Sequence, residues 1–244
     1  MMRPVFKTIL RSIVILSVCL IPAHLIASSE DAESKNISID TQSFEEVSLS
    51  RSELGSRNAA VKVETDRGYG SGTYVTISRR KVVITAAHVV TEVSEVTIVS
   101  PSGERVPGSV LFMDVDNDFA LISLPKLNTR SPARFTPTRR SFEKIVGDNV
   151  CYSGFPSGHD ILTIRGSVAG VDRGFLMIQS YAWMGASGSG VFNNFGEFIG
   201  VLTAVDVGFF DGSAHIVESI VWIVPISNIE TKLLKSIIEE KIPL

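Results

Sequence analysis

Residues 185–190 (GASGSG) surround the hydroxyl of Ser187 with small residues. Gly185 and Gly188 impose little steric limit on the backbone, so the chain can turn sharply here, expose the Ser187 hydroxyl and aim neighbouring N–H groups at one point. A serine in this setting could act as a nucleophile, although a Gly/Ser run taken alone is also typical of a plain turn. The chemistry therefore depends on which other residues the fold brings to Ser187.

Two upstream segments supply the partners that a serine nucleophile needs. Residues 82–90 (VVITAAHVV) form a β-branched apolar run, which predicts a buried strand that delivers His88 to its end. Residues 114–124 (DVDNDFALISL) join an acidic turn to an apolar strand and place Asp118 where that strand begins. Taken singly, His88 could be a core histidine and Asp118 a turn or cap residue. Asp116 competes with Asp118 as the acid.

The order of the three residues along the chain separates two folds that use the same chemistry. In α/β-hydrolases a Gly-x-Ser-x-Gly elbow is followed by the acid and then by the histidine. After Ser187 the only histidine is His215, and the acidic residues before it lie too close for the strands and helices of that fold. The order His88, Asp118, Ser187 is instead that of the chymotrypsin-like proteases.

Several stretches resemble the trypsin-like serine peptidases of the bacterial HtrA-like kind. The resemblance is carried by residues 70–72 (GSG), 85–88 (TAAH), 118–122 (DFALI), 147–148 (GD), 154–156 (GFP), 185–189 (GASGS) and 196–201 (GEFIGV). It extends over roughly residues 56–240 and predicts a protease domain without a PDZ domain. The resemblance implies a serine endopeptidase that hydrolyses peptide bonds of protein or peptide substrates through an acyl-enzyme intermediate.

The resemblance also implies a role for each residue of the site. His88 takes the proton of Ser187 and returns it to the leaving amine, while Asp118 holds the imidazole tautomer. The N–H groups of Gly185 and Ser187 form the oxyanion hole. Ala186 departs from the pattern, since many relatives have Asp or Asn there, and it removes one side chain that could hold the oxyanion loop. The alternative functions are an inactive protease-fold binding protein and an esterase or other acyl transferase.

By analogy with the family, the primary substrate pocket has Tyr181 at its floor and a neighbouring strand as one wall. The predicted wall residues are Leu202, Thr203 and Ala204. The floor position is not Asp and the strand carries no His, so cleavage after basic or acidic residues is not expected. An apolar pocket narrowed by Tyr181 predicts small or medium aliphatic residues before the scissile bond.

Short alternating strands and frequent turns predict an all-β protein, which the resemblance specifies as two antiparallel β-barrels with a C-terminal helix. Hydrophobic residues make up 44% of the chain and 19 glycines supply turns, which suits many short strands around a core. We expect barrel one over about 58–135, barrel two over about 145–225, and a closing helix over about 227–241 that packs on barrel two. Ser227 and Glu230 have the spacing of a capping box for that helix.

The N-terminus has the composition of a targeting segment. Residues 1–27 combine early basic residues with an apolar run that is short for a membrane span and contains Pro22. This pattern predicts a signal peptide or, if it is not cleaved, an N-terminal anchor. Residues 28–57 are acidic and serine-rich and are expected to form a linker. We therefore expect an exported protein, periplasmic or secreted, that contacts a membrane only if the leader is uncleaved.

Charge and cysteine content narrow the possible partners. The formal charge is −3, and loss of the three basic residues of the leader makes it more negative, which gives no electrostatic case for nucleic acid. Only Cys151 lies outside the leader, so no intramolecular disulfide is expected and Cys151 is interpreted as a small buried residue. The residues point to no metal or cofactor, and residues 28–57 indicate no oligomeric state.

Overall fold

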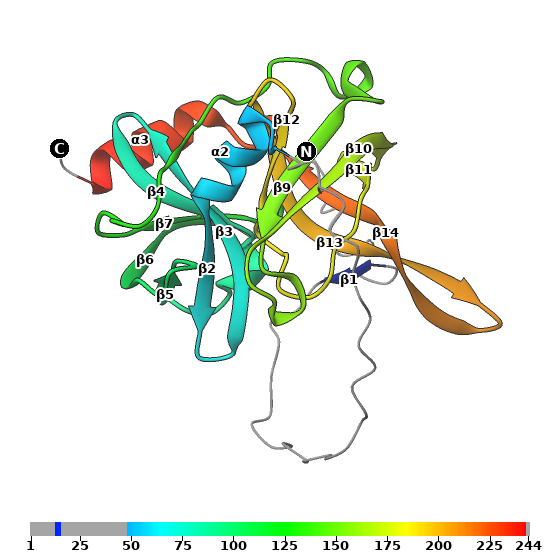
Figure 1. Cartoon of the computed structure of the whole chain (residues 1–244), viewed down its shortest axis with the longest axis horizontal. Coiled ribbons are helices and arrows are strands. Elements are labelled where there is room, and N and C mark those ends of the chain that lie inside the picture. The colour runs from blue at the N-terminus through cyan, green and yellow to red at the C-terminus, as the bar shows by residue number, and fades with distance from the viewer. Residues whose placement is uncertain (1–12, 16–47, 243–244) are drawn as a thin grey trace, which may run out of the picture.

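Six strands of the N-terminal half pair into the first of two closed antiparallel barrels (Figure 1). The computed structural model describes residues 13–15 and 48–242. The strands of barrel one are β2 (Ala60–Thr65), β3 (Gly68–Ile77), β4 (Arg80–Thr85), β5 (Glu95–Val99), β6 (Arg105–Asp114) and β7 (Phe119–Ser123). They pair in the order β2-β5-β6-β7-β4-β3, and the pairing of β2 with β3 closes the barrel. The short strand β8 (Ala133–Arg134) adds in parallel to β3.

The C-terminal half repeats this architecture in barrel two. Its strands are β9 (Asn149–Gly154), β10 (Leu162–Asp172), β11 (Phe175–Gln179), β12 (Gly190–Asn193), β13 (Phe198–Phe210) and β14 (Ser213–Pro225). They pair in the order β13-β12-β9-β10-β11-β14, and β13 pairs with β14 to close the barrel. The strand β1 (Ile13–Ile15) pairs antiparallel with residues 204–206 of β13, beyond the part of β13 that pairs with β12.

Tight turns at left-handed backbone positions join neighbouring strands. Ser78 and Arg79 connect β3 to β4 with φ of 48° and 67°, and Asp211 and Gly212 connect β13 to β14 with φ of 49° and 74°. Positive φ at both central residues gives the turns whose twist matches that of the flanking strands. The β13–β14 pair continues past the barrel as a projecting ribbon whose tip exposes Phe210 (Figure 1).

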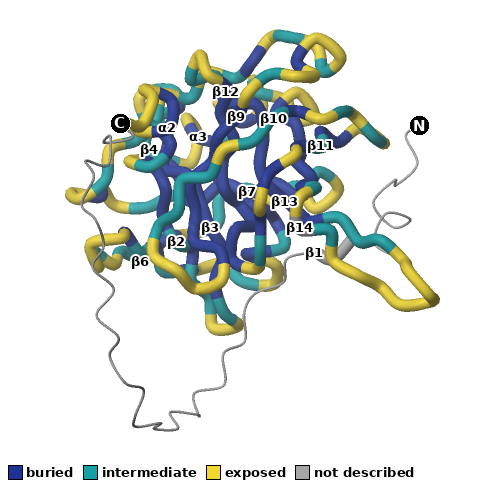
Figure 2. The backbone as a smooth tube through the Cα atoms, turned by 45° about the vertical axis from the view of Figure 1, so that its right-hand side comes forward, coloured by how far each residue is buried: buried dark blue, intermediate teal, exposed yellow. Residues whose placement is uncertain are grey.

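Buried residues line the interior of both barrels (Figure 2), and the larger buried cluster extends from barrel one to Phe192, Phe198 and Val201 of barrel two. Fully buried examples are Tyr74, Val83, Phe119 and Leu121 in barrel one, and Tyr152, Leu176, Ile178 and Leu202 in barrel two. Removing one such side chain from water contributes about 1.5–3 kcal/mol, so these interiors are the main source of stability. The predicted all-β fold of two antiparallel barrels with a C-terminal helix is confirmed.

The C-terminal helix differs from its prediction in two respects. The helix α3 (Thr231–Lys241) begins after Glu230, and its N-cap makes no side-chain hydrogen bond, so the predicted capping box does not form. Ser227 lies instead in the one-turn 3-10 helix η4 (Ile226–Asn228) that connects β14 to α3. The helix α3 contacts β6 of barrel one, where packing on barrel two was expected, and Leu234 and Ile238 join the buried cluster that contains the core of barrel one.

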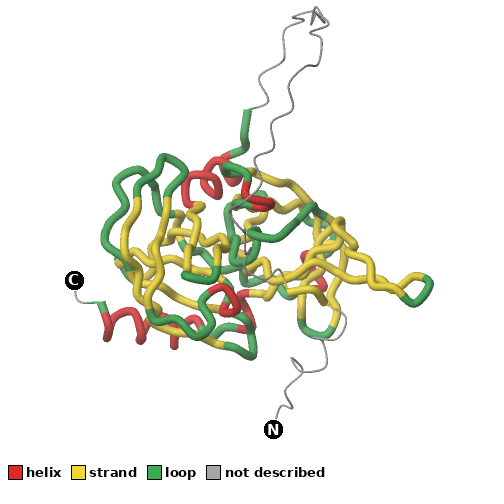
Figure 3. Tube along the Cα trace, turned by 90° about the horizontal axis from the view of Figure 1, so that it is seen from below, coloured by secondary structure: helices red, strands yellow, loops and turns green. Residues whose placement is uncertain are grey.

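A second helix, α2 (Arg51–Ala59), lies where the sequence predicts a linker. Its N-cap residue Ser50 accepts a hydrogen bond from the Glu53 N–H, and the Glu53 carboxylate accepts one from the Ser50 N–H at 2.7 Å. This capping box starts the helix. The buried face of α2 consists of Ser52, Glu53, Ser56 and Ala59, which is polar for the most part and therefore gives no apolar stripe to detect. Figure 3 shows α2 and α3 separated by the strands.

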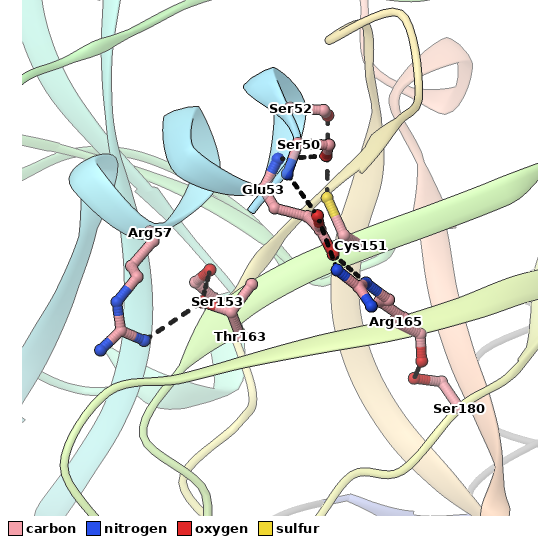
Figure 4. Close-up of polar contacts among 9 residues, drawn as sticks. All are labelled: Ser50, Ser52, Glu53, Arg57, Cys151, Ser153, Thr163, Arg165 and Ser180. Atoms are coloured by element: carbon pink, nitrogen blue, oxygen red, sulfur yellow. Dashed lines mark hydrogen bonds and ion pairs between the residues drawn. The ribbon is translucent and has the colours of Figure 1, made fainter. Parts of the chain in front are cut away.

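Polar contacts fix α2 against barrel two (Figure 4). The Ser52 hydroxyl donates to the Asn193 carbonyl at 2.6 Å, and Arg165 on β10 forms an ion pair with Glu53. Cys151 lies beneath the helix, 3.7 Å from the Ser52 hydroxyl, and is buried as the sequence predicts. Burial raises the pKa of the Cys151 thiol to about 11, which keeps it protonated and unreactive at neutral pH.

The predicted leader, residues 1–27, lies outside the described residues except for β1, and so does the predicted linker up to residue 47. Over the ranges that are described, no helix has both the length and the apolar character needed to cross a bilayer.

Candidate active site

His88 and Asp118 meet at one end of barrel one because the strands that carry them are neighbours. Thr85, the last residue of β4, pairs with Ala120 near the start of β7. The one-turn 3-10 helix η1 (Ala87–Val89) then places His88 three residues beyond β4, while Asp118 immediately precedes β7 with a left-handed φ of 46°. The two predicted strand ends therefore bring the two side chains to the same place.

Asp118 orients His88 through two hydrogen bonds. Asp118 Oδ2 lies 2.8 Å from His88 Nδ1, and Oδ1 accepts the His88 backbone N–H at 2.9 Å. The Thr203 hydroxyl also donates to Oδ2. Burial opposes ionisation of Asp118, which is 2% exposed, but the His88 charge and the hydrogen bonds from His88 and Thr203 outweigh it and lower the pKa of Asp118. Asp118 is thus a carboxylate at neutral pH, whereas Asp116, the competing candidate, is exposed.

The other imidazole nitrogen of His88 is the atom that would exchange a proton with a nucleophile. His88 Nε2 is buried and has no hydrogen-bond partner within the part of the chain that the structure describes. The His88 side chain is 15% exposed, so the ring lies largely out of water. Because Nδ1 is bonded to Asp118, Nε2 on the opposite side of the ring is the nitrogen left to contact a nucleophile.

The turn that carries Ser187 requires glycine at two positions, one on each side of the nucleophile. Gly185 and Gly188 have φ of 93° and 90°, where other residues are strained. A β-carbon on Gly185 would lie 2.5 Å from the Phe155 carbonyl oxygen, and one on Gly188 would collide with Ser71 and with Thr85 of the His88-bearing strand. The turn is therefore packed directly against the segment of barrel one that leads to His88.

Backbone hydrogen bonds hold this turn in shape. The Ser189 N–H donates to the Ala186 carbonyl at 3.1 Å, which closes the turn around Ser187. The Gly188 N–H donates to the Leu202 carbonyl at 2.8 Å, and the Leu202 N–H donates back to the Ser189 carbonyl at 2.9 Å. Ser187 is fully buried at the centre of these contacts. Its position is thus set by β13 as well as by its own loop.

The predicted oxyanion donor Gly185 N–H belongs to a peptide group that is fixed from outside the turn. The carbonyl of this peptide, on Met184, accepts the Ser157 N–H at 2.7 Å. A trans peptide is planar, so fixing the Met184 carbonyl directs the Gly185 N–H the opposite way. Ser157 lies in the 3-10 turn η3 (Pro156–Gly158) with φ of 56°, a contact that sequence reasoning missed because it spans two distant loops.

The structure places the four predicted pocket residues in different local settings. Tyr181 lines a cavity of about 270 Å³ together with Gln179, Ser180 and Ser219. The Tyr181 residue is 41% exposed. The Leu202 backbone is hydrogen-bonded to the nucleophile turn, and the Thr203 hydroxyl donates a hydrogen bond to Asp118. Ala204 packs with Trp222 in a separate small cluster. The role of Thr203 as a partner of Asp118 left no local signal, since 85 positions separate the two residues.

Two closed antiparallel barrels, with His88 and Asp118 on the first and Ser187 on the second, define a protein of the chymotrypsin-like class. The chain belongs to the family of the trypsin-like peptidase domain, which matches residues 70–201, more than half of its length. The resemblance to the HtrA-like group that the sequence predicts is confirmed.

Individual relatives are more distant. The chain is 27% identical over 150 residues to a probable periplasmic serine protease, do/HhoA-like, of Haemophilus influenzae, covering 57% of this chain and 31% of that protein. It is 26% identical over 143 residues to the uncharacterized protein y4bJ of Sinorhizobium fredii, covering 55% of this chain and 22% of that protein. The chain therefore spans between a fifth and a third of the length of these relatives.

A solved structure supports the fold. The crystal structure of the serine endoprotease from Yersinia pestis superposes with a TM-score of 0.60 at 21% identity, over 78% of this chain and 66% of that one. At 21% identity this likeness shows the shared fold.

Proposed function

We propose that this chain is an exported serine endopeptidase in which His88, Asp118 and Ser187 act as a catalytic triad. The observation that carries the proposal is the buried His88–Asp118 pair, which leaves Nε2 without a hydrogen-bond partner among the described residues. The segment that leads to His88 also packs against the turn that carries Ser187. A buried base oriented by a carboxylate is the arrangement that activates a serine hydroxyl.

In this mechanism the Ser187 hydroxyl oxygen attacks the carbonyl carbon of the scissile bond while His88 Nε2 removes its proton. The Gly185 and Ser187 N–H groups stabilise the negative charge that develops on the substrate oxygen, and each such donor contributes roughly 10²–10³ in rate. The imidazolium then gives its proton to the departing amine, which leaves an ester between Ser187 and the substrate acyl group. Water, activated by the same imidazole, hydrolyses that ester and restores Ser187.

The edge of β13 on which β1 pairs supports a polypeptide substrate. Residues Ile13–Ile15 of the chain itself pair there in antiparallel register, with Val14 opposite Val205 and Ile15 opposite Ala204. Ala204 directly follows Thr203, which contacts Asp118. An edge strand that accepts one extended apolar segment offers backbone groups that can accept another, which is how β-strand addition binds peptides. We propose that substrates bind along this edge and that Tyr181 favours small or medium aliphatic side chains before the cut.

Export is proposed from the composition of residues 1–27 and from the similarity to a relative described as periplasmic. The leader would be removed as a signal peptide or retained as an anchor.

Covalent labelling tests the triad. The purified chain is treated with a fluorophosphonate, and the adduct is located by mass spectrometry beside a His88→Ala control. We expect an adduct on Ser187 that is lost in the control, because the reagent needs a base-activated serine. A folded chain that gives no adduct would overturn the proposal and favour a binding protein of the same fold. Turnover of small esters without cleavage of any peptide in a library would favour an acyl transferase or esterase.

A further inference from the structure

Ser71, on β3 of barrel one, bonds to the nucleophile turn of barrel two through its backbone and its side chain. Its N–H donates to the Ser187 carbonyl at 2.7 Å. Its hydroxyl donates to the Gly185 carbonyl at 2.6 Å and accepts the Phe155 N–H at 3.0 Å. Ser71 is fully buried, so none of these bonds competes with water.

These bonds fix two peptide groups of the turn. The peptide between Ser187 and Gly188 is held on one side by the Ser71 N–H and on the other by the Leu202 carbonyl, which accepts the Gly188 N–H. The Gly185 carbonyl is held by the Ser71 hydroxyl. Since each peptide group is planar, these bonds set the direction of the backbone on both sides of the nucleophile.

Ser71 also connects the turn to the segment that carries the base. The Thr85 hydroxyl donates to the Ser71 carbonyl at 2.7 Å, and Thr85 is the last residue of β4, three positions before His88. Through Phe155 the same residue reaches the segment after β9. Ala186 has no polar side chain that could hold the loop from within, so the Ser71 hydroxyl supplies a side-chain hydrogen bond from outside it.

We propose that Ser71 is a positioning residue that sets the orientation of the Gly185–Ser187 turn relative to His88. This inference rests on the proposed function, since it assigns Ser71 a role in the same site. Ser71 acts through the turn and contacts no substrate in this role. A displacement of about 1 Å in a catalytic group can reduce the rate roughly 10²-fold, so loss of the hydroxyl is expected to lower kcat between about 10- and 100-fold.

The test compares Ser71→Ala with Ser100→Ala in the full chain. Ser100 is a matched control because it is also a buried serine of barrel one, 3% exposed, whose hydroxyl bonds to Ser102, Glu104 and Thr129 away from the turn. Readouts are the fluorophosphonate labelling rate, kcat and KM with p-nitrophenyl butyrate, and thermal unfolding. We expect Ser71→Ala to lower kcat and the labelling rate while KM changes less than about twofold, and Ser100→Ala to affect stability only.

Two further measurements keep the outcome decisive. Ser71→Cys retains the shape of the side chain but forms only weak hydrogen bonds, so its kcat should lie between those of wild type and Ser71→Ala. This variant also provides the test if Ser71→Ala folds poorly. Hydrogen exchange of the amides in residues 185–189 should be faster in the Ser71 variants than in Ser100→Ala. Equal exchange and equal kcat in the Ser71 and Ser100 variants would overturn the role of Ser71. An unreactive wild-type chain would instead overturn the proposed function, while exchange would still decide whether Ser71 holds the turn.

Discussion

The two halves of the candidate site are held in place by different kinds of interaction. His88 is positioned by a side chain, the buried carboxylate of Asp118, which in turn accepts a hydrogen bond from Thr203. The Ser187 turn is positioned mainly by backbone groups and by two glycines at positive φ, with the Ser71 hydroxyl as a side-chain contact from barrel one. The first half depends on the chemical identity of its residues, and the second depends mainly on the small size of its glycines.

This difference determines how each half can fail. A change at Asp118 can leave the shape of the site intact and remove only the charge that stabilises the imidazolium. A change at Gly188 can leave every titrating group in place and displace the nucleophile, because the space beside its α-carbon is already filled by Ser71 and Thr85. Variants of Asp118 should therefore report on the charge that the reaction needs, and variants of Gly188 on the position of the nucleophile.

The largest effect is expected from Asp118→Asn. An amide is similar in shape to the carboxylate but cannot hold His88 in the tautomer that leaves Nε2 free to accept a proton, so kcat should fall by about 10⁴-fold with little change in fold. Ester turnover and fluorophosphonate labelling measure the loss. Asp116→Asn is the matched control, since Asp116 is exposed two positions earlier in the same acidic turn. If Asp116→Asn were the inactive variant, the assignment of the acid would be wrong.

Gly188→Ala should have the next largest effect. The new methyl group meets Ser71 and Thr85, and the φ of 90° is itself unfavourable for alanine. We expect labelling of Ser187 to slow by about 10²-fold and stability to fall by about 3 kcal/mol, from strain and overpacking together.

Gly174→Ala separates these two contributions. Gly174 has φ of 85°, but nothing lies within 4 Å of the position that its β-carbon would take. The free energy of unfolding of Gly174→Ala should fall by only about 1 kcal/mol, which is the backbone strain, and the variant should keep full activity. Equal losses of activity in both variants would show that Gly188 acts through global stability rather than through the turn.

The half that depends on residue type was the easier one to predict. His88 and Asp118 follow and precede apolar strands, and pairing of those strands brings the two residues together. The surroundings of the predicted wall residues are harder to predict. Only the closure of barrel two shows that Thr203 contacts Asp118 and that Ala204 packs with Trp222. Ser157 acts through its backbone N–H and Ser71 through its N–H and its hydroxyl, and both contact the turn from positions distant in sequence, so residue type alone gives no signal for them.

The helices illustrate the same limit. The apolar stripe of the C-terminal segment predicts a helix but cannot say which barrel receives it, and α3 packs on barrel one. The helix α2 escapes prediction because its buried residues are mainly polar and find their partners on barrel two. In both cases the missing information is tertiary: which surface faces the helix.

The smallest effect is expected outside the site, at the contact between α2 and barrel two. The hydrogen bond from Arg165 lowers the pKa of Glu53 from 4.5 to about 2, so the ionised form stabilises the folded chain. That contribution is complete above pH 4.5 and is lost as the pH falls toward 2. Because Arg165 is 61% exposed, solvent weakens the pair, and Glu53→Gln should reduce the free energy of unfolding by about 1–2 kcal/mol at pH 7.

Urea unfolding at pH 7 and pH 3 tests this pair. The difference between wild type and Glu53→Gln should shrink at pH 3, because the unfolded wild-type chain then binds a proton that the folded chain does not. Glu64→Gln, which breaks the more exposed pair with Arg105, is the control and should change stability by less than about 1 kcal/mol. Labelling of Ser187 should be unchanged in both variants. A slower reaction in Glu53→Gln alone would mean that α2 supports the nucleophile turn as well as barrel two, and the two halves of the site would then share a common support.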